Sequence, residues 1–149
     1  MEVKKILCAV DLEDTIAPSV EYAKMMASMT GASILVAYVI PAHTPYEDVY
    51  LSVNNQPNEV NTPNETMQKS MNALLAEQFA GMDATGVILV GRPSEELVKL
   101  AEEKGANLIV MGTHGRAGFD RLLFGSVAHE VVRAAPCPVM TVRPLMPKK

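Results

Sequence analysis

Five apolar runs recur along the chain, separated by segments with the spacing of amphipathic helices. The first four runs are almost continuously hydrophobic, which is typical of parallel strands that are covered on both faces. The last run is shorter and polar at alternate positions. We predict a β-strand in each run, at residues 4–10, 32–40, 85–90, 106–111 and 138–142.

Helices are predicted between these runs, where apolar residues recur at helical spacing. Thr62, Pro63 and Glu65 form a helix-start signal, with a capping hydroxyl, a proline in the first turn and a carboxylate that reaches back. Gly105 and Pro136 mark helix ends. The four helices are expected at about residues 15–30, 62–79, 93–104 and 126–135.

This strand–helix alternation predicts the α/β class, with one open, doubly wound parallel sheet and helices on both faces. A chain of 149 residues is the length of a single domain. Ligands of such sheets bind beyond the carboxyl ends of the strands. Residues 41–62 interrupt the alternation as an irregular loop, which is either a surface excursion or a lid over a site.

Composition narrows the range of functions. Hydrophobic residues make up 48% of the chain and charged residues 20%, as in a globular domain. The net charge is 13 − 17 = −4 and the basic residues are scattered, so nucleic acid is not expected as a partner. No stretch approaches the roughly 20 apolar residues that span a bilayer, and no signal peptide is recognisable. We therefore expect a cytoplasmic protein that does not enter a membrane.

The sulfur-containing residues are interpreted as core residues. Cys8 and Cys137 lie in apolar runs, without a CxxC pair or metal-ligand spacing, so two buried thiols and no metal site are expected. Met25, Met26 and Met29 cluster on the first predicted helix, where we expect them to fill the core.

The connection between the fourth strand and the last helix carries the most informative motif. It contains Gly112, Gly115 and Gly125, and Ser126 follows directly. These glycines serve either sharp turns or the close approach of a ligand to the backbone. A helix N-terminus suits an anion, and His114 and Arg116 in the connection are cations that can meet phosphate charge. A phosphate-binding loop is one reading, and a structural turn is the other.

Other familiar sites are absent from the sequence. Neither G-x-x-x-x-G-K-[ST] nor a G-x-G-x-x-G after the first strand is present, which argues against a P-loop NTPase and a standard dinucleotide-binding domain. Asp11, at the end of the first strand, either bonds ribose hydroxyls or caps the first helix. No serine or cysteine nucleophile with a base and a carboxylate is recognisable, so no catalytic triad is expected.

The spacing Gly112-x2-Gly115-x9-Gly125-Ser126 resembles the nucleotide-binding signature of the ATP-binding branch of the universal stress proteins. Residues 108–143 resemble the C-terminal block of that family, and the opening KKILCAVDLED resembles its first strand. The resemblance is weakest over the irregular loop. It implies the strand order 3-2-1-4-5, as in adenine nucleotide α-hydrolase-like folds. It also implies an adenine nucleotide, ATP or AMP, across strands one and four, with Mg²⁺ carried between the phosphates.

The resemblance implies two sets of binding residues. The first holds the ribose or lies near the adenine, and consists of Asp11, Ala9, Val39, Met111 and Gly112. The second holds the phosphates, and consists of His114, Gly115, Gly125, Ser126 and Val127, with Arg116 nearby. Two positions depart from the family: Ala128 lacks a hydroxyl that some members carry, and Pro41 restricts the loop that closes over the base.

The resulting hypothesis is a universal stress protein that binds ATP in a regulatory role. No residue plainly positions a water for phosphoryl transfer, so hydrolysis is slow or absent. One alternative is a nucleotide-hydrolysing enzyme of similar fold, although the first strand lacks the S-G-G-x-D-S-like loop of such enzymes. Another is a nucleotide-free interaction protein, which the intact glycine pattern disfavours.

The last strand is expected at the edge of the sheet, where unpaired backbone groups invite a second chain. Members of the family commonly dimerise through this strand. We therefore expect a homodimer that pairs through residues 138–143, with Val139, Thr141 and Arg143 in the contact.

Overall fold

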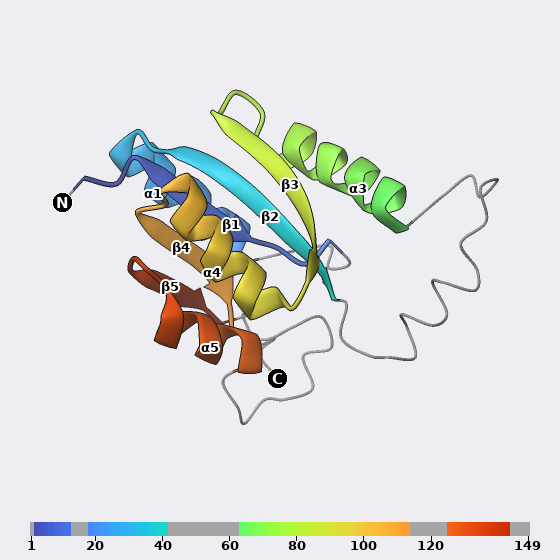
Figure 1. Ribbon diagram of the computed structural model, residues 1–149. Helices are drawn as coiled ribbons and strands as arrows, with labels where there is room; N and C mark the ends of the chain where they lie inside the picture. Colours follow the sequence, from blue (N-terminus) through green and yellow to red (C-terminus); the bar gives the residue numbers. More distant parts are fainter. Residues whose placement is uncertain (1, 13–17, 42–62, 114–124, 144–149) are drawn as a thin grey trace, which may run out of the picture.

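The computed structural model describes residues 2–12, 18–41, 63–113 and 125–143 (Figure 1). Five parallel strands form one sheet in the order β3-β2-β1-β4-β5, which confirms the predicted fold class and strand order. The strands are β1 (Lys5–Ala9), β2 (Ser33–Pro41), β3 (Ala84–Gly91), β4 (Leu108–Gly112) and β5 (Val139–Val142). The helices are α1 (Pro18–Thr30), α3 (Pro63–Gln78), α4 (Pro93–Lys104) and α5 (Ser126–Ala134).

The helices cover both faces of the sheet, and each face has its own hydrophobic core. α1 and α3 pack on one face, whereas α4 and α5 lie together on the other, in front of the sheet in Figure 1. Along β1, Ile6 and Cys8 point into the α1/α3 core, and Leu7 points into the α4/α5 core. This alternation explains the continuous apolar runs of the sequence, because both faces of the central strands are buried.

On the α4/α5 face, β1 and β2 each carry an alanine after a leucine as they approach their carboxyl ends. On that face Leu7 is followed by Ala9, and Leu35 is followed by Ala37. The two alanines are neighbours in the β1–β2 register. On the α1/α3 face, β2 instead carries the large side chain of Tyr38, which packs against the core. The two alanine side chains leave space on the α4/α5 face near the carboxyl edge of the sheet.

Helix boundaries follow the expected signals where the structure describes them. α4 has Pro93 in its first turn and ends at Gly105, whose φ of 67° is the left-handed conformation that favours glycine. The N–H groups of Gly105 and Ala106 return to the carbonyls of Glu102 and Ala101, which closes the helix. α3 begins at Pro63 as predicted. The capping residue Thr62 and the loop 42–62 lie outside the described residues.

Three expectations about burial were wrong. Met25 and Met29 are 45% and 73% exposed, because α1 buries its opposite side, built from small residues and a valine. Met26 does pack against the core. Cys137 is only half-buried, and β3, an edge strand, is less buried than its sequence predicted, with Val90 56% exposed. Among the described residues, no helix is long and apolar enough to cross a membrane.

Candidate functional site

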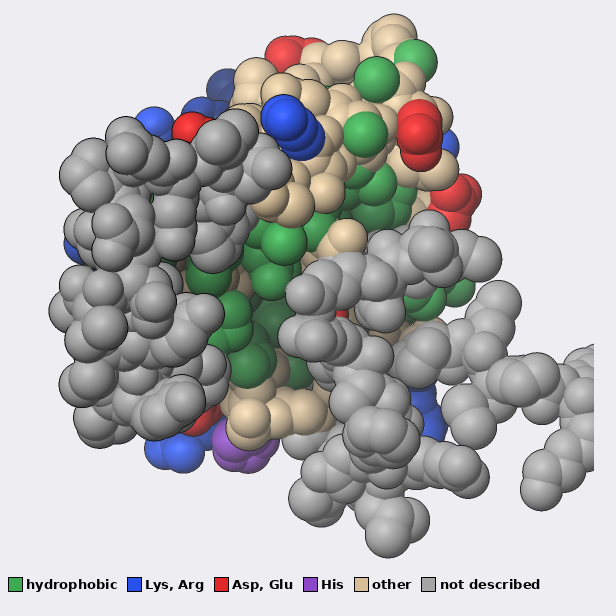
Figure 2. Space-filling view, turned by 90° about the vertical axis from the view of Figure 1, so that its right-hand side faces the viewer, with side chains coloured by type: hydrophobic (Ala, Val, Ile, Leu, Met, Phe, Trp, Pro, Cys, Tyr) green, Lys and Arg blue, Asp and Glu red, His purple; other side chains and the backbone are tan. Residues whose placement is uncertain are grey.

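A cleft of about 390 Å³ opens at the carboxyl edge of the sheet, on the α4/α5 face. Hydrophobic side chains gather in a hollow on this side of the molecule (Figure 2). The cleft lies between β1, β2 and β4, the N-terminal end of α4 and the N-terminal end of α5. It is lined by Ala9, Val10, Asp11, Ala37, Tyr38, Val39, Pro41, Pro93, Leu97, Met111, Gly112, Thr113, Gly125, Ser126, Val127 and Ala128.

Most residues that the sequence nominated for a site come together in this cleft, although they are far apart in the chain. Those that line it are Ala9, Asp11, Val39, Met111, Gly112, Gly125, Ser126 and Val127. The other nominated residues, His114, Gly115 and Arg116, lie outside the described residues. Their described chain neighbour Thr113 lines the cleft.

One part of the cleft is an apolar slot. Ala9, Ala37 and Val39 contribute from the central strands, and Pro93 and Leu97 contribute from the first turns of α4. The only charged residue among the described lining residues is Asp11, just beyond β1. An apolar slot with few polar groups is the usual construction of a small-molecule site.

The glycines of the cleft are not explained by backbone turns. Gly112 lies in the extended backbone of β4, and Gly125 has φ −53° and ψ 142°, which any residue adopts. The positive φ values among the described glycines are at Gly31, Gly81, Gly91 and Gly105, none of which lines the cleft. The lack of a side chain at Gly112 and Gly125 therefore matters for the space that it leaves at the cleft wall.

The N-terminus of α5 lies at the cleft wall, where Ser126, Val127 and Ala128 line the cleft. Gly125 precedes the helix and cannot cap it with a side chain, so the N–H groups of the first turn have no capping partner there. The positive end of the helix dipole lies at the same place. Gly125 donates its N–H to the carbonyl of Thr113 at 2.7 Å, and Thr113 donates to the carbonyl of Val142 at 3.0 Å. These bonds hold the start of α5 against the ends of β4 and β5.

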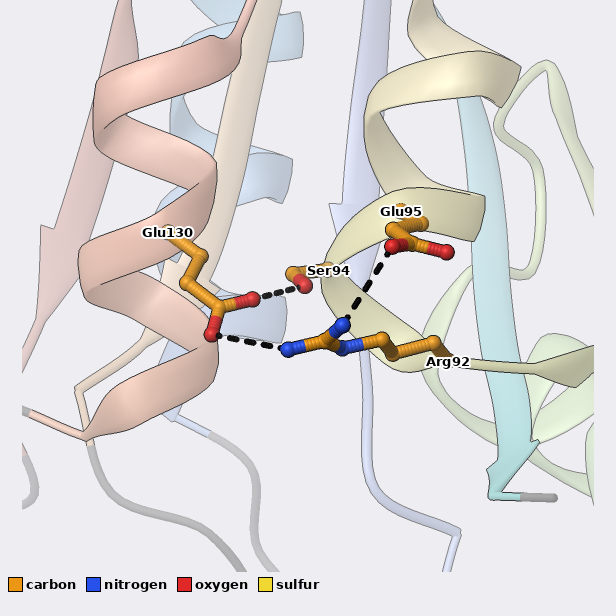
Figure 3. A network of polar contacts seen from close by, with 4 residues as sticks. All are labelled: Arg92, Ser94, Glu95 and Glu130. Atoms are coloured by element: carbon orange, nitrogen blue, oxygen red, sulfur yellow. Dashed lines mark hydrogen bonds and ion pairs between the residues drawn. The ribbon is translucent and has the colours of Figure 1, made fainter. Parts of the chain in front are cut away.

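A polar network joins α4 to α5 beside the cleft (Figure 3). The Ser94 hydroxyl, on a residue only 5% exposed, donates a hydrogen bond to the carboxylate of Glu130. The Arg92 guanidinium lies 3.6 Å from the other Glu130 oxygen and 3.4 Å from Glu95 Oε1. No local sequence signal predicts this network, because Ser94 and Glu130 are 36 positions apart.

Cys8 lies directly before the cleft residue Ala9 but points to the opposite face. Its Sγ is 3.9 Å from the carbonyl oxygen of Ser19, and burial raises the pKa of its thiol to about 12. The Ser19 hydroxyl donates to the carbonyl of Ala9 at 3.2 Å, which ties α1 to the end of β1. Because the thiol stays protonated at neutral pH, Cys8 is not an activated nucleophile. Its role is structural.

Sequence reasoning missed six residues of the cleft wall: Val10, Ala37, Tyr38, Thr113, Pro93 and Leu97. The positions of Pro93 and Leu97 follow from the topology of the sheet. In the order β3-β2-β1-β4-β5, α4 must return from the edge strand β3 to β4, so it crosses β2 and β1 from their carboxyl ends. The first turns of α4 are thereby placed over the same edge as Asp11. No group of three metal-binding side chains is found among the described residues.

The chain is similar over its length to several proteins of one family. The sequence model of the universal stress protein family matches residues 2–143. Universal stress protein MJ0531 of Methanocaldococcus jannaschii is 33% identical over 150 residues, which cover 98% of this chain and 84% of that protein. Universal stress protein MJ0577 of the same organism is 28% identical over 153 residues, covering 94% of each chain.

Solved structures agree with this relationship. The structure of MJ0577 has a TM-score of 0.77 at 27% identity, and the similarity covers 99% of this chain and 100% of that chain. A universal stress protein of Archaeoglobus fulgidus, solved in complex with dAMP, has a TM-score of 0.57 at 25% identity, covering 95% and 98% of the two chains. The family match, the parallel sheet and the cleft at its carboxyl edge lead to one conclusion: this chain belongs to the universal stress protein family.

Proposed function

We propose that this universal stress protein binds an adenine nucleotide, ATP or AMP, in the carboxyl-edge cleft. The proposal rests on Gly112 and Gly125. Both line the cleft, although other residues could adopt their backbone conformations. Glycine at such positions lets a ligand approach the main chain closely. The Archaeoglobus relative solved with dAMP supports an adenine nucleotide as the ligand class.

Each part of the cleft has a role in this proposal. The apolar slot around Ala9, Val39 and Met111 accommodates the base, and Asp11 bonds the ribose hydroxyls. The free N–H groups of α5, at Ser126 and Val127, bind phosphate oxygens. His114, Gly115 and Arg116 complete the phosphate site, and Mg²⁺ enters with the phosphates rather than through a protein cage.

The role is regulatory binding, with slow or no hydrolysis. No described cleft side chain is an activated nucleophile, and only Asp11 among the described lining residues is a carboxylate. Fast phosphoryl transfer needs groups that position a water and neutralise developing charge. The cytoplasmic location and the lack of a nucleic-acid partner stay predictions from the sequence.

The first experiment identifies what the protein carries. We would purify it without added nucleotide, denature it, and analyse the released small molecules by chromatography and mass spectrometry. Calorimetric titration with ATP and AMP would follow. The expected result is release or binding of an adenine nucleotide. No release together with no calorimetric binding at millimolar ATP would refute the nucleotide proposal and favour a nucleotide-free interaction protein.

A variant locates the site. Gly125→Val keeps an allowed backbone conformation but places a branched side chain at the cleft wall, so nucleotide affinity should fall at least about tenfold. Ala134→Val is the control, since it places the same branched side chain at the exposed far end of α5. Equal affinities in both variants would place the nucleotide elsewhere.

We also propose that the chain forms a homodimer through β5, which lies at the edge of the sheet. The edge presents unpaired backbone groups, and Val139, Thr141 and Arg143 lie on or beside it. Sedimentation equilibrium of the wild type and of Thr141→Pro tests this assignment. Proline removes a backbone donor, so dimer dissociation should rise. A wild-type mass that stays monomeric at every concentration would exclude the dimer.

A further inference from the structure

The bridge of Arg92, Ser94 and Glu130 occupies a short stretch of surface between two cleft-forming helices (Figure 3). Ser94 directly follows the cleft residue Pro93, and Glu130 lies one helical turn after the cleft residue Ser126. Both oxygens of the Glu130 carboxylate have a partner at the start of α4: the hydroxyl of Ser94 in its first turn and the guanidinium of Arg92 just before it. The carboxylate is therefore held in one orientation.

The apolar anchoring of α5 is small, so the bridge adds a constraint beyond the backbone bonds that hold its start against β4 and β5. α5 has nine residues, of which only Ala128 and Val131 are buried. Val127 adds a partly buried contact with the same core. α4, in contrast, buries Leu97 and Leu100 among others. The small side chains of α5 resist sliding and rotation of a helix less than a set of large side chains does. The contact between Ser94 and Glu130 supplies a directional constraint that this packing lacks.

The two ends of the cleft differ in their dependence on α5. The apolar slot is built mainly from β1, β2 and α4, whereas the free amides at the cleft wall belong to α5. Hydrogen bonds to phosphate oxygens weaken steeply when their angles change. Loss of the bridge should therefore affect the amide end and spare the slot.

We propose that Ser94 and Glu130, supported by Arg92, are positioning residues that orient the α5 amides toward the phosphates of the bound nucleotide. They act through α5 and do not themselves touch the ligand. The inference rests on the proposed nucleotide-binding function and adds to it the selectivity for phosphorylated over unphosphorylated ligands. It assigns a role to a network that lies outside the glycine motif.

The test compares ligands that differ only in phosphate. Calorimetric affinities for ATP, AMP and adenosine would be measured for the wild type, Ser94→Ala and Glu130→Gln. We expect about a tenfold loss for ATP in Ser94→Ala, the scale of one hydrogen bond to a charged group, with adenosine unchanged within about twofold. Ser94→Thr keeps the hydroxyl and should restore the affinity for ATP.

Glu102→Gln is the matched control, because Glu102 lines the same groove between α4 and α5 but is exposed and lies two turns further along α4. It should leave all three affinities unchanged. Thermal unfolding of each variant confirms that the fold is retained; Glu130→Gln preserves side-chain shape and serves if Ser94→Ala is unstable.

The outcomes separate the inference from the function on which it rests. If the wild type binds ATP and the bridge variants bind it equally well, the positioning role is wrong and the nucleotide site stands. An equal loss for ATP and adenosine also overturns it, since that is the signature of general loosening. If the wild type binds no nucleotide at all, both proposals fall.

Discussion

On the α1/α3 face of the sheet, the core continues to the carboxyl ends of the central strands, whereas on the α4/α5 face the adjacent alanines Ala9 and Ala37 line a cleft. Cys8, which precedes Ala9 on β1 but points to the filled face, is completely buried. The same strands thus serve stability on one face and leave a cleft on the other. Substitutions on the two faces should therefore have separable effects.

The largest expected effect is on the filled face. Met71 on α3 is completely buried, and its Cγ would lie 2.5 Å from a Cβ added at Gly86, which shows how closely α3 packs on β3. Met71→Ala should lower the free energy of unfolding by about 2–5 kcal/mol, through lost burial and the cavity left behind. Denaturant unfolding measures the loss. Nucleotide affinity should stay within about twofold, and a large loss of affinity would show that the faces are not independent.

The second effect is on the open face, where a substitution should lower nucleotide affinity and leave stability nearly unchanged. Ala9→Leu adds three carbons to the wall of the cleft, where the side chain has room in the absence of ligand. We expect nucleotide affinity to fall by about 10- to 100-fold, from about 1–3 kcal/mol of steric conflict, with little change in unfolding. Calorimetry measures the loss, and Ala134→Leu on exposed surface is the control. Undiminished binding would remove Ala9 from the site.

The third effect is the pH dependence of stability that the buried Cys8 thiol causes. The pKa of its thiol is about 12 in the folded protein against 9.0 for an unperturbed thiol, because burial disfavours the thiolate. Below pH 9 both states are protonated, so its contribution to stability is full. Above pH 9 the unfolded chain releases the proton first, and unfolding becomes easier by about 1.4 kcal/mol per pH unit up to about pH 12.

Urea unfolding of the wild type and of Cys8→Ala, measured between pH 8 and a pH of about 10.5, tests this expectation. The other titrating groups, including Cys137, are common to both proteins and cancel in the difference. The stability difference should shift against the wild type as the pH rises above 9. Parallel curves would show that Cys8 is accessible to solvent in the folded protein.

The smallest effect is expected on the outside of the filled face. Met29 on α1 is 73% exposed, so Met29→Gln should change the free energy of unfolding by less than about 0.5 kcal/mol. Thermal denaturation beside Met71→Ala gives the contrast between an exposed and a buried methionine. A destabilisation above about 1 kcal/mol would mean that Met29 is covered in solution, for instance by a second chain.

Much of the fold was predictable because its local signals agree with its packing. α4 spans Pro93–Lys104 as predicted, and it ends at the glycine that the sequence marked as its stop. Most nominated cleft residues were also found, because strand ends and a strand–helix connection are visible in the sequence. The exposure of Met25 was not predicted, because a methionine does not by itself indicate which side of its helix is buried. The contact of Ser94 with Glu130 likewise depends on how two distant helices meet.

The adjacent alanines also bear on how such a site changes over evolution. An alanine codon becomes a valine codon by one base change, and valine at Ala9 or Ala37 narrows the space while the core around Met71 stays intact. The mutational distance between a chain with an open cleft and one with a narrowed cleft is therefore very short. This scaffold can thus gain or lose a ligand through intermediate sequences that still fold.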